Sequence, residues 1–189
     1  MAIRIIAGAL KRRKLQTLPG KNIRPTSDRL RESIFNILST QVSDAVVLDL
    51  FSGTGAMGIE ALSRGAKFCV FIDKNKNALD LVRKNSAHCG LENCTLILGW
   101  DLARNLDCLK TLGKNFDLVF MDPPYHQAMV HPALIHLHTS AMLKNGARIV
   151  IEHGSREIVP DEITGYEKSD QRQYGKTTVS ILTYISSRH

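Results

Sequence analysis

The chain has 189 residues, a length that fits one domain of ordinary size with a true hydrophobic core. Its apolar runs are shorter than a membrane span, and the one before the first charges is too short for a secretory signal. Composition therefore disfavours membrane and secreted classes, and we expect a soluble cytoplasmic protein. The four cysteines include no CxxC pair and fit small buried residues better than a disulfide framework.

The net charge of +7 comes entirely from the start of the chain. Residues 1–40 contain nine Lys or Arg and two acids (9 − 2 = +7), whereas the other 149 residues contain 16 basic and 16 acidic side chains. A basic segment on a neutral body indicates that this segment contacts a polyanion. A solvated run of charges without a partner is the simpler alternative.

The first 42 residues predict an extension laid against a larger domain. Two short strands, at residues 4–7 and 15–18, flank the cations of a basic hairpin. Residues 26–40 begin with capping residues and carry one apolar stripe, which predicts a helix with Arg29 and Arg31 on its other faces. The segment holds too little apolar area to fold alone.

Strands and helices alternate beyond residue 43, which predicts a parallel sheet covered on both faces. The expected strands are residues 46–51, 68–73, 94–99, 116–122 and 147–153. The expected helices are residues 56–64, 76–88, 102–109 and 132–144, the last one stopped by Asn145-Gly146. Residues 166–174 and 177–185 predict two antiparallel strands that close the far edge of the sheet.

A glycine-rich loop follows the first of these strands. Gly53, Gly55 and Gly58 satisfy the G-x-G-x-x-G pattern, in which glycines let the backbone approach a ligand. In dinucleotide enzymes this loop holds a pyrophosphate. Asp49, four residues before the first glycine, would repel such an anion, so a cationic ligand group fits better.

Four strands end in or near an acid, namely Asp49, Asp73, Asp101 and Asp122. Each alone is compatible with a helix cap. Together they lie at the carboxyl edge, where open α/β sheets bind ligands. Asp73 is placed to accept hydrogen bonds from ribose hydroxyls, and Asp101 from an exocyclic amine.

The strand that ends at Asp122 runs directly into two prolines and a tyrosine. Pro123 and Pro124 have no N–H for a sheet ladder, so the strand must stop there. The stop leaves the Asp122 carboxylate and unpaired main-chain carbonyls at the sheet edge, with Tyr125 projecting from a stiff corner. A proline-terminated strand with a surface aspartate is the plain alternative.

Several of these stretches resemble a known class of enzyme. The loop DLFSGTGAMGIEAL, the strand end FIDKN and the corner DPPY resemble the class I S-adenosylmethionine-dependent methyltransferases. RPTSDRLRESIFNIL, GIEALSRGA and QYGKTTVSILTY resemble more closely the bacterial RsmD family, which methylates the exocyclic N2 of a guanine in small-subunit (16S) ribosomal RNA. The resemblance covers nearly the whole chain. It implies a Rossmann-like α/β fold, a seven-stranded, mostly parallel sheet with an antiparallel last strand, divided into residues 1–42 (hairpin and helix) and 43–189 (methyltransferase domain).

The resemblance also implies roles for individual residues toward S-adenosyl-L-methionine. The methionine part would be held by Asp49, Phe51, Ser52, Gly53, Thr54 and Gly55. Asp73, with Lys74 beside it, would take the ribose hydroxyls, and Asp101 the adenine amine. Thr26 and Arg29 would support the methionine carboxylate. Trp100 is a departure, because relatives more often carry a small or acidic residue there.

Methyl transfer gives the DPPY corner a chemical role. Asp122 and the carbonyl of Pro123 would accept hydrogen bonds from the target amine, and Tyr125 would stack on the flipped base. Ribosomal RNA or an assembling small subunit would be gripped by Arg4, Lys11, Arg12, Arg13, Lys14, Lys21 and Arg24. We expect a monomer. We also expect no metal site, because the chain's clustered histidines lack an i, i+4 pair: His126, His131, His136 and His138.

Three alternatives remain open. An adenine-N6 methyltransferase acting on DNA or RNA would use the same DPPY corner, although such DNA enzymes usually carry a target-recognition insertion for which this chain has no room. A nicotinamide-dependent oxidoreductase would use the same glycines but leaves Asp49 and DPPY unexplained. A non-catalytic RNA-binding protein would need only the basic segment.

Overall fold

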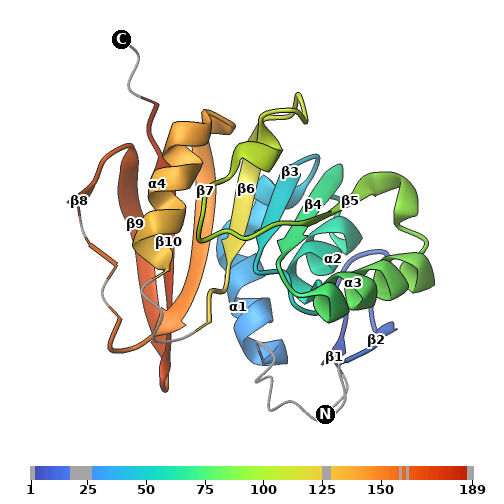
Figure 1. Cartoon of the computed structure of the whole chain (residues 1–189). Helices are drawn as coiled ribbons and strands as arrows, with labels where there is room; N and C mark the ends of the chain where they lie inside the picture. The colour runs from blue at the N-terminus through green and yellow to red at the C-terminus, as the bar shows by residue number, and fades with distance from the viewer. Residues whose placement is uncertain (1–2, 18–26, 125–128, 158, 161, 187–189) are drawn as a thin grey trace.

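The structure is a computed structural model that describes residues 3–17, 27–124, 129–157, 159–160 and 162–186. It contains a two-stranded hairpin and an eight-stranded sheet with the order β5-β4-β3-β6-β7-β10-β9-β8 (Figure 1). The strands are β1 Ile3–Arg4, β2 Lys14–Leu15, β3 Val46–Leu50, β4 Phe68–Asp73, β5 Thr95–Gly99, β6 Phe116–Met121, β7 Leu143–Gly154, β8 Glu162–Ile163, β9 Tyr166–Tyr174 and β10 Thr177–Tyr184. The helices are α1 Asp28–Leu38, α2 Ala56–Ser63, α3 Lys76–Cys89 and α4 Val130–Ser140, with 3₁₀ turns at Ser39–Val42, Glu92–Cys94 and Asp107–Leu109.

The strand order is that of a class I methyltransferase. Strands β3 to β7 are parallel to one another, and β10 runs antiparallel to both β7 and β9. The predicted sheet with its antiparallel last strand is therefore confirmed. The predicted antiparallel pair, β9 and β10, follows β7 toward the far edge, and one detail differs from the prediction: the two-residue β8 pairs with β9 and adds an eighth strand.

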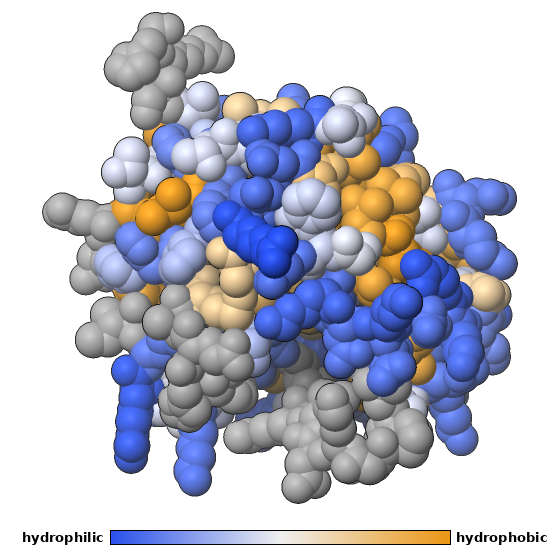
Figure 2. All heavy atoms as spheres, viewed as in Figure 1, coloured by the Kyte–Doolittle hydropathy of each residue, from blue (hydrophilic) through white to orange (hydrophobic). Residues whose placement is uncertain are grey.

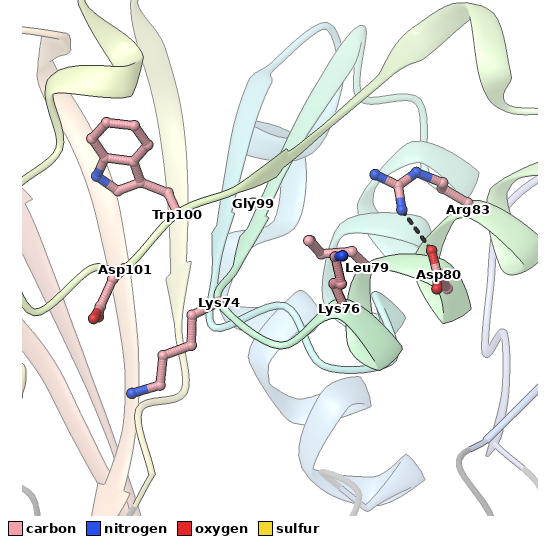
Figure 3. A pocket seen from close by; sticks show the side chains of 8 residues that line it. All are labelled: Lys74, Lys76, Leu79, Asp80, Arg83, Gly99, Trp100 and Asp101. Carbon is pink, nitrogen blue, oxygen red and sulfur yellow. Dashed lines mark hydrogen bonds and ion pairs between the residues drawn. The ribbon is translucent and has the colours of Figure 1, made fainter.

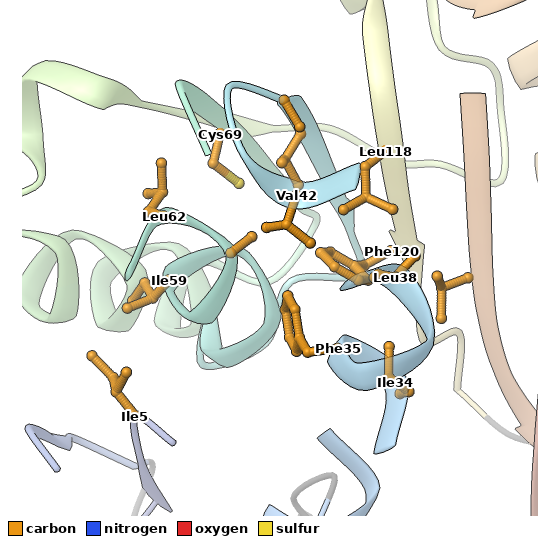
Figure 4. Close-up of a cluster of buried hydrophobic side chains, with 14 of the residues drawn as sticks. Ile5, Ile34, Phe35, Leu38, Val42, Ile59, Leu62, Cys69, Leu118 and Phe120 are labelled. Atoms are coloured by element: carbon orange, nitrogen blue, oxygen red, sulfur yellow. The ribbon is translucent and has the colours of Figure 1, made fainter. Parts of the chain in front are cut away.

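Each face of the sheet is covered by one apolar cluster, because its strands alternate their side chains between the two faces. On one face, α1, α2 and α3 pack against the sheet, with Phe35 of α1 in ring contact with Phe120 of β6 (centroids 5.5 Å apart; Figure 4). On the other face, α4 and the segment of residues 102–112 pack against β6 and β7. The end of β6, where the DPPY corner begins, is thus supported from both sides.

The N-terminal segment is fastened to α2 by buried hydrogen bonds. The Glu60 carboxylate, 1% exposed, accepts from the main-chain amides of Ile6 (2.7 Å) and Ala7 (3.0 Å). Ile5 joins the same apolar cluster as the α2 side chain Ile59. The boundary at residue 42 stays a prediction, and the packing across it is continuous.

Two predicted helices differ from the structure. Residues 102–109 form only the 3₁₀ turn Asp107–Leu109, because the side chains of Asp101 and Asn105 accept hydrogen bonds from the amides of Ala103 and Asp107, and such local turns compete with a helix. Helix α4 ends at Ser140, so Asn145-Gly146 lies inside β7 and does not stop the helix.

Arg31 was predicted on a face of its helix other than the apolar stripe, but its side chain is buried with that stripe. Its side chain is 1% exposed and donates from Nη2 to the Arg4 carbonyl (2.6 Å) and to Asp28 (3.0 Å). Burial lowers its pKa, which the Asp28 and Glu60 carboxylates oppose. The guanidinium therefore links α1 to β1.

The surface seen in Figure 2 is mostly hydrophilic, with an apolar area over the edge of the sheet where β5 lies. Strand β5 is only partly buried, as expected for a strand with a neighbour on one side. Among the described helices, none has both the length and the apolar character needed to cross a bilayer.

Candidate active site

The glycine loop and the start of the helix that follows it are hydrogen-bonded to two acids. Asp49, on β3, accepts a hydrogen bond from the Gly58 amide (3.0 Å), and Asp73, at the end of β4, accepts one from the Gly53 amide (3.0 Å). Gly53 and Gly55 have positive φ angles (54° and 75°), which favour glycine, and Phe51 also has a positive φ of 60°. The loop therefore presents main-chain groups at the carboxyl edge between β3 and β4.

Gly58 has a packing role, distinct from the loop itself. A Cβ at this position would lie 2.4 Å from the Phe71 ring and 2.6 Å from Cys69 Sγ. Only glycine lets the first turn of α2 approach β4 so closely, which keeps the Gly58 amide within reach of Asp49.

The Asp49 carboxyl is buried (4% exposed) and costly to ionise. Desolvation raises its pKa to about 8, the hydrogen bond from Gly58 opposes the shift, and the Asp73 charge adds to it. A cationic ligand group beside Asp49 would stabilise the carboxylate. The predicted preference of this site for a cation over a pyrophosphate is thus consistent with its electrostatics.

The loop also has unused capacity for a ligand. Ser52 is 7% exposed, and its Oγ has no hydrogen-bond partner among the described residues. Gly53 faces open space, since a Cβ there would have only the Phe51 carbonyl nearby, at 3.8 Å. A buried hydroxyl without a partner and an accessible backbone fit an amino-acid moiety such as the methionine part of the cofactor.

A hollow of about 730 Å³ lies beside α3, and Lys74, the residue after Asp73, lines it. The two carboxylate oxygens of Asp73 accept from the amides of Gly53 and Asn75 and retain lone pairs for further donors. The hollow is lined by Lys74, Lys76, Leu79, Asp80, Arg83, Gly99, Trp100 and Asp101 (Figure 3). Lys74 and Asp101, both predicted cofactor residues, extend toward the same side in Figure 3, whereas the indole of Trp100 extends the other way.

The DPPY corner follows β6 as predicted. Strand β6 ends at Met121, Asp122 is exposed and Pro123 is buried, while Tyr125 lies outside the described residues. The parallel pairing of Asp49 with Phe120 puts the loop and the corner on adjacent strands.

A further carboxylate at this edge, Glu152 on β7, was not predicted from the sequence. Met121 pairs with Ile151, so Glu152 follows the same register as Asp122, and its side chain is 9% exposed. Desolvation by the surrounding protein raises the pKa of Asp122, and repulsion from the carboxylates of Glu152 and Asp49 raises it further. Because Asp122 is exposed, water relieves part of the desolvation and screens part of the repulsion from the two neighbouring carboxylates. The signal for Glu152 was an acid near the end of an apolar strand.

Comparison with known proteins shows the family to which this chain belongs. The family described as "Conserved hypothetical protein 95" matches residues 3–183. The chain belongs to this family. Ribosomal RNA small subunit methyltransferase D of Buchnera aphidicola (subsp. Acyrthosiphon pisum) is 34% identical over 191 residues, covering 98% of this chain and 94% of that protein. The YlbH protein of Bacillus subtilis is 33% identical over 179 residues, covering 95% and 97%. A solved structure of the Escherichia coli protein yhhF has a TM-score of 0.87 and 28% identity, and the two chains are covered to 99% and 100%.

In this member of the Conserved hypothetical protein 95 family, the predicted RNA-binding cations divide into three groups. The side chains of Lys11, Arg12 and Lys14 are exposed and form no hydrogen bond or ion pair with another described residue, whereas the main-chain amides of Lys11 and Arg12 are bonded within the hairpin. Arg4 pairs with Asp28 (2.9 Å), and Arg13 donates to the His88 carbonyl (2.9 Å). Lys21 and Arg24, like Thr26, lie outside the described residues.

The described part of this family member also contains no group of three or more His, Cys, Asp or Glu side chains that could hold a metal ion. His131, His136 and His138 lie on α4, whereas His126 is outside the described residues.

Proposed function

We propose that the chain methylates the exocyclic N2 amine of a guanine in small-subunit ribosomal RNA, with S-adenosyl-L-methionine as methyl donor. The carrying observation is the pairing of β3 with β6, which sets a glycine loop with spare hydrogen-bonding capacity beside an exposed aspartate. Family membership and the name of the Buchnera relative support the reaction and its substrate. Methylation of ribosomal RNA would place the protein in the cytoplasm. We further propose that it acts as a monomer, on free RNA or on assembling subunits.

The cofactor supplies an electrophilic methyl group on a sulfonium sulfur. In this proposal Asp49 faces the methionine ammonium, and Ser52 and the main chain of residues 51–55 hold the rest of that moiety. Asp73, with Lys74 beside it, binds the ribose hydroxyls, and Asp101 binds the adenine amine. These groups would fix the donor against β3 and β6, so the target amine needs only to be aligned with it.

The corner aligns the amine. The lone pair of an exocyclic amine is delocalised into the base, so the amine is a weak nucleophile. Asp122 and the Pro123 carbonyl would accept hydrogen bonds from its two N–H groups, direct the lone pair at the methyl group and stabilise positive charge that develops on nitrogen. Once the nitrogen has taken the methyl group, it would carry a positive charge beside the Asp122 carboxylate until one of its protons departs to water. Tyr125 would stack on the base.

The RNA itself would be gripped by the basic N-terminal segment. Lys11, Arg12 and Lys14 are exposed cations near the α2 and α3 side of the sheet, held there by the bonds to Glu60. Phosphate contacts of this kind bind RNA without regard to sequence, so the choice of guanine falls to the corner.

The test is to identify the methylated nucleoside. The chain is incubated with radiolabelled S-adenosylmethionine and unmethylated small-subunit RNA or subunits, and the digested RNA is analysed by mass spectrometry. We expect N2-methylguanosine, lost in Asp122→Ala and retained in Asp107→Ala, which removes an exposed acid paired with Lys110. Formation of N6-methyladenosine would support the adenine-specific alternative, and RNA binding without any transfer would support the non-catalytic one.

A further inference from the structure

Asn85, in the middle of α3, joins two segments that are distant in the sequence. Its Oδ1 accepts from the Gln16 amide (2.8 Å), and its Nδ2 donates to the Gln16 carbonyl (3.2 Å). The same Nδ2 donates to the Thr54 carbonyl in the glycine loop (3.0 Å). One side chain thus holds both the end of β2 and the loop.

The Asn85 side chain is 0% exposed, and its hydrogen bonds leave it no other orientation. Both amide hydrogens are used, one on each carbonyl, and the oxygen is used by the Gln16 amide. Turning the amide over would bring oxygen against two carbonyl oxygens and hydrogens against an N–H. The carbonyl of Thr54 is therefore held at a fixed distance from the main chain of Gln16.

We propose that Asn85 is a positioning residue that makes the shape of the cofactor loop depend on the docked N-terminal segment. The inference rests on the proposed function, because it assigns the loop to the cofactor. Thr54 lies between Gly53, whose amide is bonded to Asp73, and Gly55, which starts α2 with a left-handed φ. Glycines on both sides of Thr54 make the loop easy to deform, so a bond to its carbonyl has a large influence on its geometry.

The same segment carries the cations predicted to bind RNA. Lys11, Arg12 and Lys14 precede Gln16 by two to five residues, and the segment is fastened at its other end by the bonds from Ile6 and Ala7 to Glu60. A displacement of this segment would move the main chain of Gln16, shift the Asn85 side chain bonded to it, and so displace the Thr54 carbonyl in the loop. Binding of RNA and cofactor would then be coupled, and such coupling is reciprocal.

Asn85→Asp tests the link, because it keeps the acceptor for the Gln16 amide and removes the donors to both carbonyls. Ser86→Ala is the matched control, since Ser86 is buried on the same helix and its Oγ has no partner among the described residues. The first readout is the affinity of the full chain for S-adenosylhomocysteine by calorimetry. We expect a decrease of roughly 5- to 100-fold in Asn85→Asp, the range for a lost buried hydrogen bond, and less than about twofold in Ser86→Ala.

The second readout needs no cofactor. Hydrogen exchange of a peptide that spans residues 50–58 should become faster in Asn85→Asp than in Ser86→Ala, with α4 as the unchanged reference. Should Asn85→Asp not fold, Gln16→Pro removes the amide that donates to Asn85 and keeps the Gln16 carbonyl. Gln16→Ala is its control for the loss of the exposed Gln16 side chain, since only the main chain contacts Asn85. Gln16→Pro is expected to weaken affinity and speed up loop exchange.

The outcomes separate the inference from the proposed function. The inference would be overturned if a folded Asn85→Asp variant bound S-adenosylhomocysteine and exchanged the amides of residues 50–58 as the wild type does. It would also be overturned if Gln16→Pro and Gln16→Ala showed the same affinity and the same loop exchange. Absence of cofactor binding in the wild type would overturn the proposed function, whereas the exchange measurement would still decide whether Asn85 positions the loop.

Discussion

Cofactor binding should depend on pH through Asp49. In the ligand-free protein, burial raises the pKa of this carboxyl to about 8, so at neutral pH it is mostly protonated. The methionine ammonium of S-adenosylmethionine or S-adenosylhomocysteine would favour the carboxylate. Binding below pH 8 should therefore be accompanied by the release of one proton from the protein.

The size of the effect follows from the pKa. With a pKa of about 8, roughly one molecule in a hundred carries the carboxylate at pH 6 and roughly one in ten at pH 7. Affinity should thus rise about tenfold per pH unit between about pH 5.5 and 7, or about 1.4 kcal/mol per unit. The rise should stop near pH 8, where the α-amino group of the ligand begins to lose its own proton.

The same shift affects the stability of the ligand-free protein. The folded pKa lies above the unfolded value near 3.9, so the unfolded chain binds fewer protons between these values. The stabilisation is therefore fully present below about pH 4 and is lost as pH rises through about 8. Its upper limit is on the order of 5 kcal/mol, and Asp49→Asn should remove this pH dependence.

Calorimetry with S-adenosylhomocysteine at pH 6.5, in buffers with different ionisation enthalpies, measures the proton directly. The wild type should release about one proton per ligand and Asp49→Asn none. Asp107→Asn, an exposed acid paired with Lys110, should behave like the wild type. A wild type that releases no proton and binds with equal affinity from pH 5.5 to 7 would refute the role of Asp49.

Three further predictions concern the corner, the basic segment and the core. Glu152→Gln removes a charge that raises the pKa of Asp122, so the acid limb of the kcat/KM profile should move to lower pH; a shift to higher pH would contradict this. Replacing Lys11, Arg12 and Lys14 with Ala should reduce the log-log salt slope of RNA binding by roughly 2, whereas Lys110→Ala should leave it unchanged, and an unaltered slope in the triple variant would exclude these cations from the interface. Gly58→Ala should lower the free energy of unfolding, measured with a chemical denaturant, by on the order of 1–3 kcal/mol, because its Cβ would lie 2.4 Å from the Phe71 ring. Gly99→Ala should lower it less, because its Cβ would approach only the flexible end of Leu79, at 3.2 Å. Equal stability of the two variants would argue against the packing role of Gly58.

The sheet was predictable because its signals are local. Each parallel strand contains a short apolar run, β4 to β7 end at or directly before an acid or a glycine, and α2 and α3 end at or next to a glycine, Gly65 or Gly90. The acids at the carboxyl edge followed from the same boundaries, and the structure brings Asp49 and Asp73 to the two sides of the loop.

The features that the sequence did not predict depend on partners far along the chain. Arg31 resembles a surface residue until β1 supplies a carbonyl for its guanidinium. Glu152 approaches Asp122 only through the register of β6 and β7, and Asn85 acts on main chain 31 and 69 residues away. In the case of residues 102–109, the apolar spacing suggested a helix, but the turns at Asp101 and Asn105 prevailed.

Single-turnover methyl transfer by Asp122→Asn tests the central claim most directly. The variant keeps the shape of the corner and removes the negative charge, so we expect the transfer rate to fall by roughly 10²- to 10³-fold while the affinities for RNA and S-adenosylhomocysteine stay within about twofold. A variant that transfers the methyl group to guanine N2 at the wild-type rate would contradict the claim that the DPPY corner activates the amine.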